Sequence, residues 1–313
     1  MIRRGIGLLP AILLSAILLS AILLLLLAGS ISHSSPSGSR LQVVVSFSIL
    51  QDIAKQVAGV DAKILTLIGP DADAHAFEPS PDQARLLAAA QLFVVNGLGF
   101  ESWLARLTRS AQFRGAVVTA SEGIGPLTGA EPGHAQRLPD PHAWQDVRNA
   151  AVYAENIARA LADADPAHAA AYRQRLRSYQ AELEALDRHV RDELAAIPRA
   201  KRRVITTHAA FAYYGKAYDV AFLAPEGVST DAEPSAKAVA ELIRQIRREG
   251  IKALFLENIA DPRLVQELAR EAGTSLGPPL YSDALSGPNG PAPTYLRMIE
   301  YNTDALKAGM LKN

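Results

Sequence analysis

Residues 41–68 read LQVVVSFSILQDIAKQVAGVDAKILTLI, a pattern typical of a strand, a helix and a second strand. The β-branched run Leu41–Phe47 predicts a buried strand, Ile49–Ala58 predicts a short helix, and Ala62–Ile68 predicts another strand. Strands joined through a helix usually lie parallel in one sheet and are connected by a right-handed crossover. This stretch therefore predicts an α/β fold built on parallel sheet.

The alternation of strands and helices continues on both sides of a long helical segment. In the first half we expect further strands at Gln91–Val95 and Ala116–Ala120, and helices at Pro81–Ala90, Glu101–Ala111 and Asp146–Ala162. In the second half we expect strands at Arg203–Thr206, Val220–Leu223, Ala253–Leu256 and Pro279–Tyr281, and helices at Ala236–Glu249, Asp261–Ala272 and Thr294–Met310. Each half therefore has enough predicted strands for a sheet of its own.

The long helical segment is Pro166–Ile197. Its apolar residues recur at steps of three and four and so share one face: Tyr172, Leu176, Tyr179, Leu183, Leu186 and Val190. About 30 helical residues span about 45 Å, which exceeds a small lobe. We therefore expect a rigid bridging helix at 166–197 between an N-terminal α/β lobe at 41–165 and a C-terminal α/β lobe at 198–313.

The amino terminus has the layout of an export signal. Arg3 and Arg4 precede an apolar run, Ile6–Ala28, and small residues follow at Ala28-Gly29-Ser30. We expect a signal peptide at 1–30 and a flexible Ser/Gly/Pro-rich tether at 31–40. The apolar run is long enough to remain as a membrane anchor, which is the alternative. In both cases the body is exported, because the basic end stays inside.

Composition narrows the class of protein. The chain contains no cysteine, which excludes disulfides and the lipid-bearing cysteine of a lipoprotein, and we expect a periplasmic protein. Lys and Arg together number 32, as do Asp and Glu, so no polyanionic partner such as nucleic acid is indicated. The short basic runs 201–203 and 247–248 lack interleaved aromatic residues and are interpreted as solvated faces.

Three histidines and one aspartate lie in loops that follow predicted strands: His75, His142, His208 and Asp283. Ligands of parallel α/β sheets bind beyond the carboxyl ends of the strands. Imidazole and carboxylate are ligands for zinc and neighbouring divalent ions. Taken singly, each residue also fits a packing or capping role. Together they predict one metal site between the lobes, whereas His33, His134, His168 and His189 are expected to face solvent.

The strings around these four residues resemble the metal-binding receptors of bacterial zinc and manganese ABC importers. The similarity covers about Gln42 to Leu311 and is most specific in HAFEPSP at 75–81, DPHAW at 140–144 and THAAF at 207–211. FVVNG at 93–97, FLE at 255–257 and YLRMIEYN at 295–302 are also alike. The resemblance implies two α/β lobes joined by one rigid helix. It also implies that His75, His142, His208 and Asp283 are the four metal ligands.

Zinc is the expected cargo, with manganese as the alternative. Three imidazoles with one carboxylate suit zinc, whereas manganese favours more carboxylate oxygen, and manganese-selective relatives place a carboxylate where this chain has His208. The loop at 121–141 holds only His134 and lacks the long histidine-rich insertion of many zinc receptors. Glu78 and Glu257 are candidate partners of the ligand imidazoles. Phe77, Trp144 and Phe211 are candidates for an apolar collar.

The expected function is capture of the ion in the cleft between the lobes, followed by delivery to an ABC permease in the inner membrane. We expect a monomer and no enzymatic activity. A zinc hydrolase is a weaker alternative, because a catalytic zinc usually keeps one position open and four protein ligands would close it. A metal-dependent surface adhesin is the third alternative, and a retained anchor would suit it.

Overall fold

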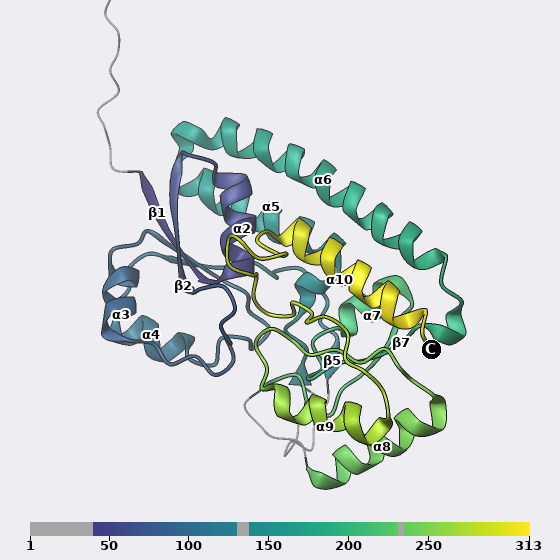
Figure 1. Ribbon diagram of the computed structural model, residues 1–313. Coiled ribbons are helices and arrows are strands. Elements are labelled where there is room, and N and C mark those ends of the chain that lie inside the picture. Colours follow the sequence, from purple (N-terminus) through teal and green to yellow (C-terminus); the bar gives the residue numbers. More distant parts are fainter. Residues whose placement is uncertain (1–39, 130–137, 231–234) are drawn as a thin grey trace, which may run out of the picture. The chain divides into compact units, whose positions relative to one another are not determined.

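The first half of the chain forms a parallel sheet with strand order β2-β1-β3-β4. Figure 1 shows β1 beside β2 in this sheet. The computed structural model describes residues 40–129, 138–230 and 235–313. The strands are β1 (Leu41–Phe47), β2 (Ala62–Ile68), β3 (Leu92–Val95) and β4 (Ala116–Thr119). Val43 pairs with Ile64 on one side and with Leu92 on the other, so β1 is a central strand and is buried on both faces.

Helices α2 (Ser48–Ala58), α3 (Pro81–Ala88) and α4 (Leu104–Ser110) connect these strands, and α5 (Val147–Ala164) follows the sheet. The sequence specifies the start of α3 in detail. The Ser80 hydroxyl accepts a hydrogen bond from the backbone N–H of Gln83, and the Gln83 side-chain oxygen accepts one from the backbone N–H of Ser80. Pro81 occupies the first turn. This capping box ends the loop that carries His75.

The long helix α6 (Ala169–Ala195) has 27 residues and follows a 3-10 turn at Pro166–His168, as predicted within two residues. It contacts α2 and α5 of the first half, and α7 (Ala212–Tyr218) and α10 (Tyr295–Met310) of the second (Figure 1). Its buried residues include the predicted apolar face, except that Leu176 is half-buried. One helix therefore runs along both halves.

The second half contains a smaller sheet. β7 (Arg203–Ile205) and β8 (Ala221–Leu223) are parallel, and single parallel bridges link Ile205 to Leu254, Leu254 to Leu276 and Glu257 to Leu280. The strands predicted at 253–256 and 279–281 are thus wrong as regular strands, although the segments lie in the sheet. Pro278 and Pro279 lack the backbone N–H that a continuous ladder would require.

Helices α8 (Ala236–Glu249) and α9 (Pro262–Ala272) cover a small buried cluster of this second sheet, which includes Ile205, Leu254 and Leu268. The main buried cluster extends from β1 to α10 and contains residues of both halves. The described residues accordingly group into one unit, Arg40–Asn313. The boundaries at 41–165, 166–197 and 198–313 stay a prediction.

The loop at 121–141 contains a short antiparallel ladder, β5 (Thr128–Gly129) with β6 (Leu138–Pro139). Within the described residues, no helix combines the length and apolar character that a membrane span requires. The predicted signal peptide and residues 31–39 of the tether lie outside the described residues.

Candidate metal centre

His75 lies in the loop between β2 and α3. Its backbone N–H donates to Asp73 Oδ1 at 2.8 Å, and the indole of Trp103 donates to the neighbouring carbonyl of Ala74 at 3.2 Å. The edge of the His75 ring meets Phe100, with ring centroids 4.8 Å apart. The loop is therefore fixed at its backbone, and one side of the imidazole packs against an aromatic ring.

His142 is held by the residues around it in the Asp140-Pro141-His142 loop. Asp140 Oδ1 accepts from the backbone N–H of His142 at 2.9 Å and lies 2.8 Å from its Nδ1. A carboxylate accepts only, so Nδ1 carries a proton and Nε2 is the nitrogen that is free to bind a metal. The loop itself is fixed by Asn96 Nδ2, which donates to the Pro141 carbonyl, and by the Tyr213 hydroxyl, which donates to the Asp140 carbonyl.

His208 directly follows β7 and has the same kind of support from Glu257. Glu257 Oε1 accepts from the backbone N–H groups of Thr207 at 2.8 Å and His208 at 3.0 Å. Its other oxygen lies 2.6 Å from His208 Nδ1. Glu257 is thus confirmed as a neighbour of a candidate ligand, as the sequence predicted, and it directs Nε2 of His208 away from itself.

Asp283 follows the Leu280 bridge of the second sheet, yet first-half residues hold its loop. The indole of Trp144 and the amide of Gln145 both donate to the Ser282 carbonyl, at 2.9 and 2.8 Å. Two residues beyond Asp283, the backbone N–H of Leu285 donates to Ser48 Oγ at 2.9 Å. These contacts place Asp283 beside His142.

The four residues converge on one point. Nε2 of His142 lies 3.4 Å from Nε2 of His75 and 3.3 Å from Nε2 of His208. Asp283 Oδ2 lies 3.2 Å from Nε2 of His75 and of His208, and Oδ1 lies 3.5 Å from Nε2 of His142. All four ligand atoms lie within 4.8 Å of one another. Within the described residues, no other group of three or more such side chains meets this condition.

The cluster is buried, and a cation would stabilise its carboxylate. His142, His208 and Asp283 are fully buried, and His75 is 6% exposed. Neither carboxylate oxygen of Asp283 has a hydrogen-bond partner in the structure. A buried carboxylate that faces only imidazole rings needs positive charge beside it, which protons on those rings or a metal ion at the centre of the cluster would supply. The donor set of three imidazoles and one carboxylate therefore fits a divalent ion.

The electrostatic environment of the cluster favours the charged forms of His142, His208 and Asp283. Burial lowers the pKa of His142, but the Asp283 carboxylate and Asp140 outweigh it and raise the pKa to about 9. Burial likewise opposes the charged form of His208, yet Glu257 and Asp283 raise its pKa well above the ordinary value. Burial would raise the pKa of Asp283, but His142 and His208 hold it well below its usual range. Without metal, protons on His142 and His208 balance the carboxylate, so an incoming cation must displace them.

The other predicted roles have mixed outcomes. Glu78 is exposed and contacts none of the four residues in the described structure, so its proposed role is wrong. Trp144 packs against His142 with ring centroids 5.2 Å apart, whereas Phe211 stacks on Phe222 and Phe77 meets Trp103. Sequence reasoning missed Asp140 and Phe100. The spacing Asp-x-His could have indicated Asp140, since a carboxylate two residues before a histidine can reach its backbone N–H.

The remaining histidines lie apart from the cluster. His189 is exposed on α6, and His168 is half exposed beside Asp165 at the start of that helix. His33 and His134 lie outside the described residues.

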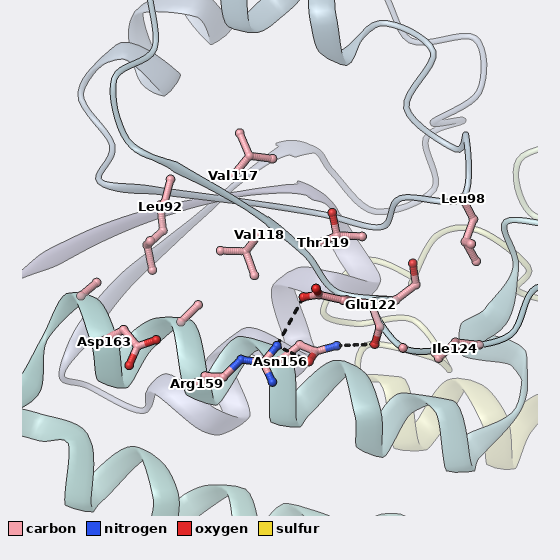
Figure 2. Close-up of a pocket in the computed structure, with 15 residues that line it drawn as sticks. Leu92, Leu98, Val117, Val118, Thr119, Glu122, Ile124, Asn156, Arg159 and Asp163 are labelled. Atoms are coloured by element: carbon pink, nitrogen blue, oxygen red, sulfur yellow. Dashed lines mark hydrogen bonds and ion pairs between the residues drawn. The ribbon is translucent and has the colours of Figure 1, made fainter.

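A hollow separate from this cluster, shown in Figure 2, has a volume of about 810 Å³ and lies between β4 and α5. Its walls are largely apolar, with Leu92, Val118 and Ile124 among them. Arg159 and Asn156 at its floor bond to each other and to groups of residues 120–122. It contains no histidine and does not compete with the buried cluster as a metal site.

Comparison with known proteins agrees with this geometry. Residues 43–309 match the family described as "Zinc-uptake complex component A periplasmic". The iron-binding protein YfeA of Yersinia pestis is 33% identical over 279 residues, covering 89% of each chain. The manganese ABC transporter substrate-binding lipoprotein scaA of Streptococcus gordonii is 28% identical over 287 residues, covering 90% of this chain and 92% of the relative.

Solved structures show the same fold. The periplasmic zinc-binding protein TroA from Treponema pallidum matches with a TM-score of 0.81 at 28% identity, covering 87% of this chain and 99% of that chain. The Mn-bound periplasmic metal-binding protein from Candidatus Liberibacter asiaticus matches with a TM-score of 0.78 at 26% identity, covering 87% and 100%. This chain therefore belongs to the zinc-uptake component A family, the substrate-binding receptors of metal ABC importers, and is not an enzyme.

Proposed function

We propose that the cargo of this receptor is Zn²⁺, bound by His75, His142, His208 and Asp283 and delivered to a permease in the inner membrane. The receptor class follows from the family, but the names of the relatives mention iron, manganese and zinc. The cargo must therefore be argued from the geometry of this chain. Manganese is the alternative.

The spacing of the ligand atoms supports zinc. Zinc bonds to nitrogen and oxygen are about 2.0–2.1 Å long, and a tetrahedron with such bonds has edges of roughly 3.3–3.4 Å. Four of the six separations among Nε2 of His75, His142 and His208 and Oδ2 of Asp283 lie between 3.2 and 3.4 Å. The other carboxylate oxygen lies 3.5 Å from Nε2 of His142, and all four ligand atoms lie within 4.8 Å of one another. This match is the observation that carries the proposal.

The chemistry of the donors points the same way. Manganese favours more oxygen ligands than this site supplies. The two nearest additional carboxylates, Asp140 and Glu257, are directed at the Nδ1 atoms of His142 and His208. Among the described residues, Asp283 is thus the carboxylate that the cluster offers to the ion. Three imidazoles and one carboxylate suit a four-coordinate zinc ion.

Calorimetric titration of the metal-free protein with zinc and manganese separately, at neutral pH, tests the proposal. We expect one zinc ion per chain, bound tightly, and manganese unable to displace it. His142→Ala should weaken zinc binding by more than about 100-fold, because it removes one of four ligands. His189→Ala, on the exposed face of α6, is the matched control and should bind as the unaltered chain does. An affinity of His142→Ala for zinc equal to that of the unaltered chain would contradict the site. Tight manganese binding would change the proposed cargo to manganese.

The location and assembly of the receptor are part of the proposal. We infer a periplasmic monomer that is exported by residues 1–30, because a receptor with one buried site per chain needs no symmetric partner. Many relatives are named lipoproteins, whereas this chain has no cysteine to carry a lipid. Release of the protein with the periplasmic contents and a monomer mass by light scattering are expected. Recovery at the outer surface would instead favour the adhesin alternative.

A further inference from the structure

The loop Ala224–Thr230, called here the latch loop, contacts the loop that carries His208. The backbone N–H of Ala209 donates to the Gly227 carbonyl at 2.9 Å, and that of Glu226 donates to the Thr207 carbonyl at 3.4 Å. These backbone bonds lie on either side of His208 in the sequence. The first part of the latch loop is therefore hydrogen-bonded to the segment that carries His208.

The other end of the latch loop reaches the first half of the chain. The Thr230 hydroxyl donates to Asp73 Oδ2 at 2.7 Å, and Asp73 Oδ1 accepts from the backbone N–H of His75 at 2.8 Å. One carboxylate thus joins the backbone of a candidate ligand to a hydroxyl 157 residues away in sequence. The latch loop links the His75 loop to the His208 loop through this carboxylate.

The position of His75 depends on the bond between Asp73 and Thr230, whereas His142 and His208 each have a carboxylate partner of their own. Each of the three has a carboxylate at its backbone N–H, but those of Asp140 and Glu257 also reach the ring nitrogen Nδ1. Asp73 uses its second oxygen for Thr230 instead. His75 is also the most exposed member of the cluster, at 6%.

The Asp73–Thr230 bond lies at the wall of an open hollow. Asp73, Thr230 and Glu226 all line a pocket of about 520 Å³ bounded by α9 residues such as Leu264 and Glu267. The bond is therefore at a solvent-accessible boundary of the protein, close to the least buried ligand. A movement of the latch loop would break it without opening the main core.

We propose that Asp73 and Thr230 form a latch that holds His75 in the ligand cluster and sets the rate at which the metal leaves. Both are positioning residues, because Asp73 acts on the backbone of His75 and Thr230 acts through Asp73. The inference rests on the proposed function and names the step that controls release. Opening the latch frees His75 while His142, His208 and Asp283 keep their own supports.

The test is the rate of zinc release into a fluorescent chelator in a stopped-flow instrument. Thr230→Val keeps the side-chain shape but removes the donor, and zinc release should accelerate roughly tenfold, the effect of one lost hydrogen bond to a charged group. Thr230→Ser retains the hydroxyl and should release zinc at nearly the original rate. In an Asp73→Ala background, Thr230→Val should have no further effect. Equal release rates for Val and Ser at position 230 would overturn the latch.

Hydrogen exchange of the metal-free protein separates failure of the latch from failure of the metal site. Residues 71–77 should exchange faster in Thr230→Val than in the unaltered chain, and Thr230→Ser should restore the protection. This readout needs no metal. Unchanged exchange in Thr230→Val would overturn the latch even if zinc binds tightly, whereas changed exchange without any zinc binding would support the latch and overturn the proposed cargo.

Discussion

At the scale of single residues, two buried carboxylates decide which nitrogen of a candidate ligand histidine faces the centre of the cluster. Asp140 lies 2.8 Å from Nδ1 of His142, and Glu257 lies 2.6 Å from Nδ1 of His208. Each also fixes the backbone N–H of the same histidine. Ring orientation and tautomer are therefore set before an ion arrives, which lowers the free-energy cost of forming the site.

Glu257→Gln tests this role. The carbonyl oxygen of the introduced side chain would keep the backbone bonds, and its amide NH₂ would face Nδ1 of His208, donor against donor. The imidazole would then favour a proton on Nε2, which blocks metal binding. Zinc affinity should fall about 10–100-fold by calorimetry. Glu78→Gln, at an exposed position, is the control, and equal losses in the two variants would contradict the assignment.

The raised pKa of His142, about 9, predicts how the stability of the metal-free protein changes with pH. A histidine whose folded pKa exceeds its unfolded value stabilises the fold fully below the unfolded pKa, about 6.5, and loses that contribution as pH rises through about 9. The metal-free protein should therefore melt at lower temperature at pH 9 than at pH 6.5.

Zinc affinity should change in the opposite direction over the same window, because zinc must displace the proton. Calorimetry at pH 7.5 in buffers of different ionisation enthalpy should show protons released on zinc binding. In His142→Ala fewer protons should be released. Release of no protons by the unaltered chain would contradict the charged state described for the metal-free site.

The four candidate ligands could be predicted from the sequence because each lies in a loop that follows a predicted strand, His142 after a long one, and because the strings around them resemble the metal-receptor family. Phe100 could not, because its contact with His75 depends on how the loop after β3 folds back across the sheet. Glu78 was predicted wrongly for the same reason. Glu78 is three residues from His75, but it lies just before the start of α3, and its side chain is exposed.

At the scale of elements, the strands of the first sheet could be predicted within about one residue because they are short runs rich in β-branched and apolar residues. In the second sheet, β7 and β8 were also predicted within one residue. The segments 253–256 and 279–281 were not predictable as single bridges, since the bridges at Leu254 and Leu280 are set by neighbouring segments and not by local propensity. The helix α7 gave no clear pattern, being only seven residues long. Long periodic elements such as α6 were the most predictable.

Arg175 anchors α6 to the end of α2. Its guanidinium donates to the Val57 and Ala58 carbonyls and to Asp61, so it satisfies the free carbonyls at the end of that helix. Arg175→Met should lower the free energy of unfolding by about 2 kcal/mol, measured by urea denaturation. Arg177→Met, on the exposed face of α6, is the control. No difference between the two variants would mean that the anchor contributes nothing.

At the scale of the whole described unit, the metal cluster is not divided evenly between the two halves. His75 and His142 come from the first half, and Asp283 comes from the second but is held by Trp144, Gln145 and Ser48. The hydroxyl of Tyr295, at the start of α10, also donates to the Trp144 carbonyl at 2.6 Å. The candidate ligand His208 follows β7, whose Ile205 belongs to the separate buried cluster beside α8 and α9, and so connects this block to the second sheet.

Because the cluster joins these parts, zinc should stabilise them together. A ligand present at 1,000 times its Kd stabilises the folded state by about 4 kcal/mol, which for a chain of this size corresponds to a rise in Tm of roughly 7 °C. We expect one cooperative calorimetric transition that moves as a whole. Trp144→Phe, which keeps an aromatic ring but removes the donor to the Ser282 carbonyl, should reduce the shift, because Asp283 is then less firmly placed beside His142. Two transitions, of which zinc moves only one, would show that the halves unfold independently and that the cluster does not link them.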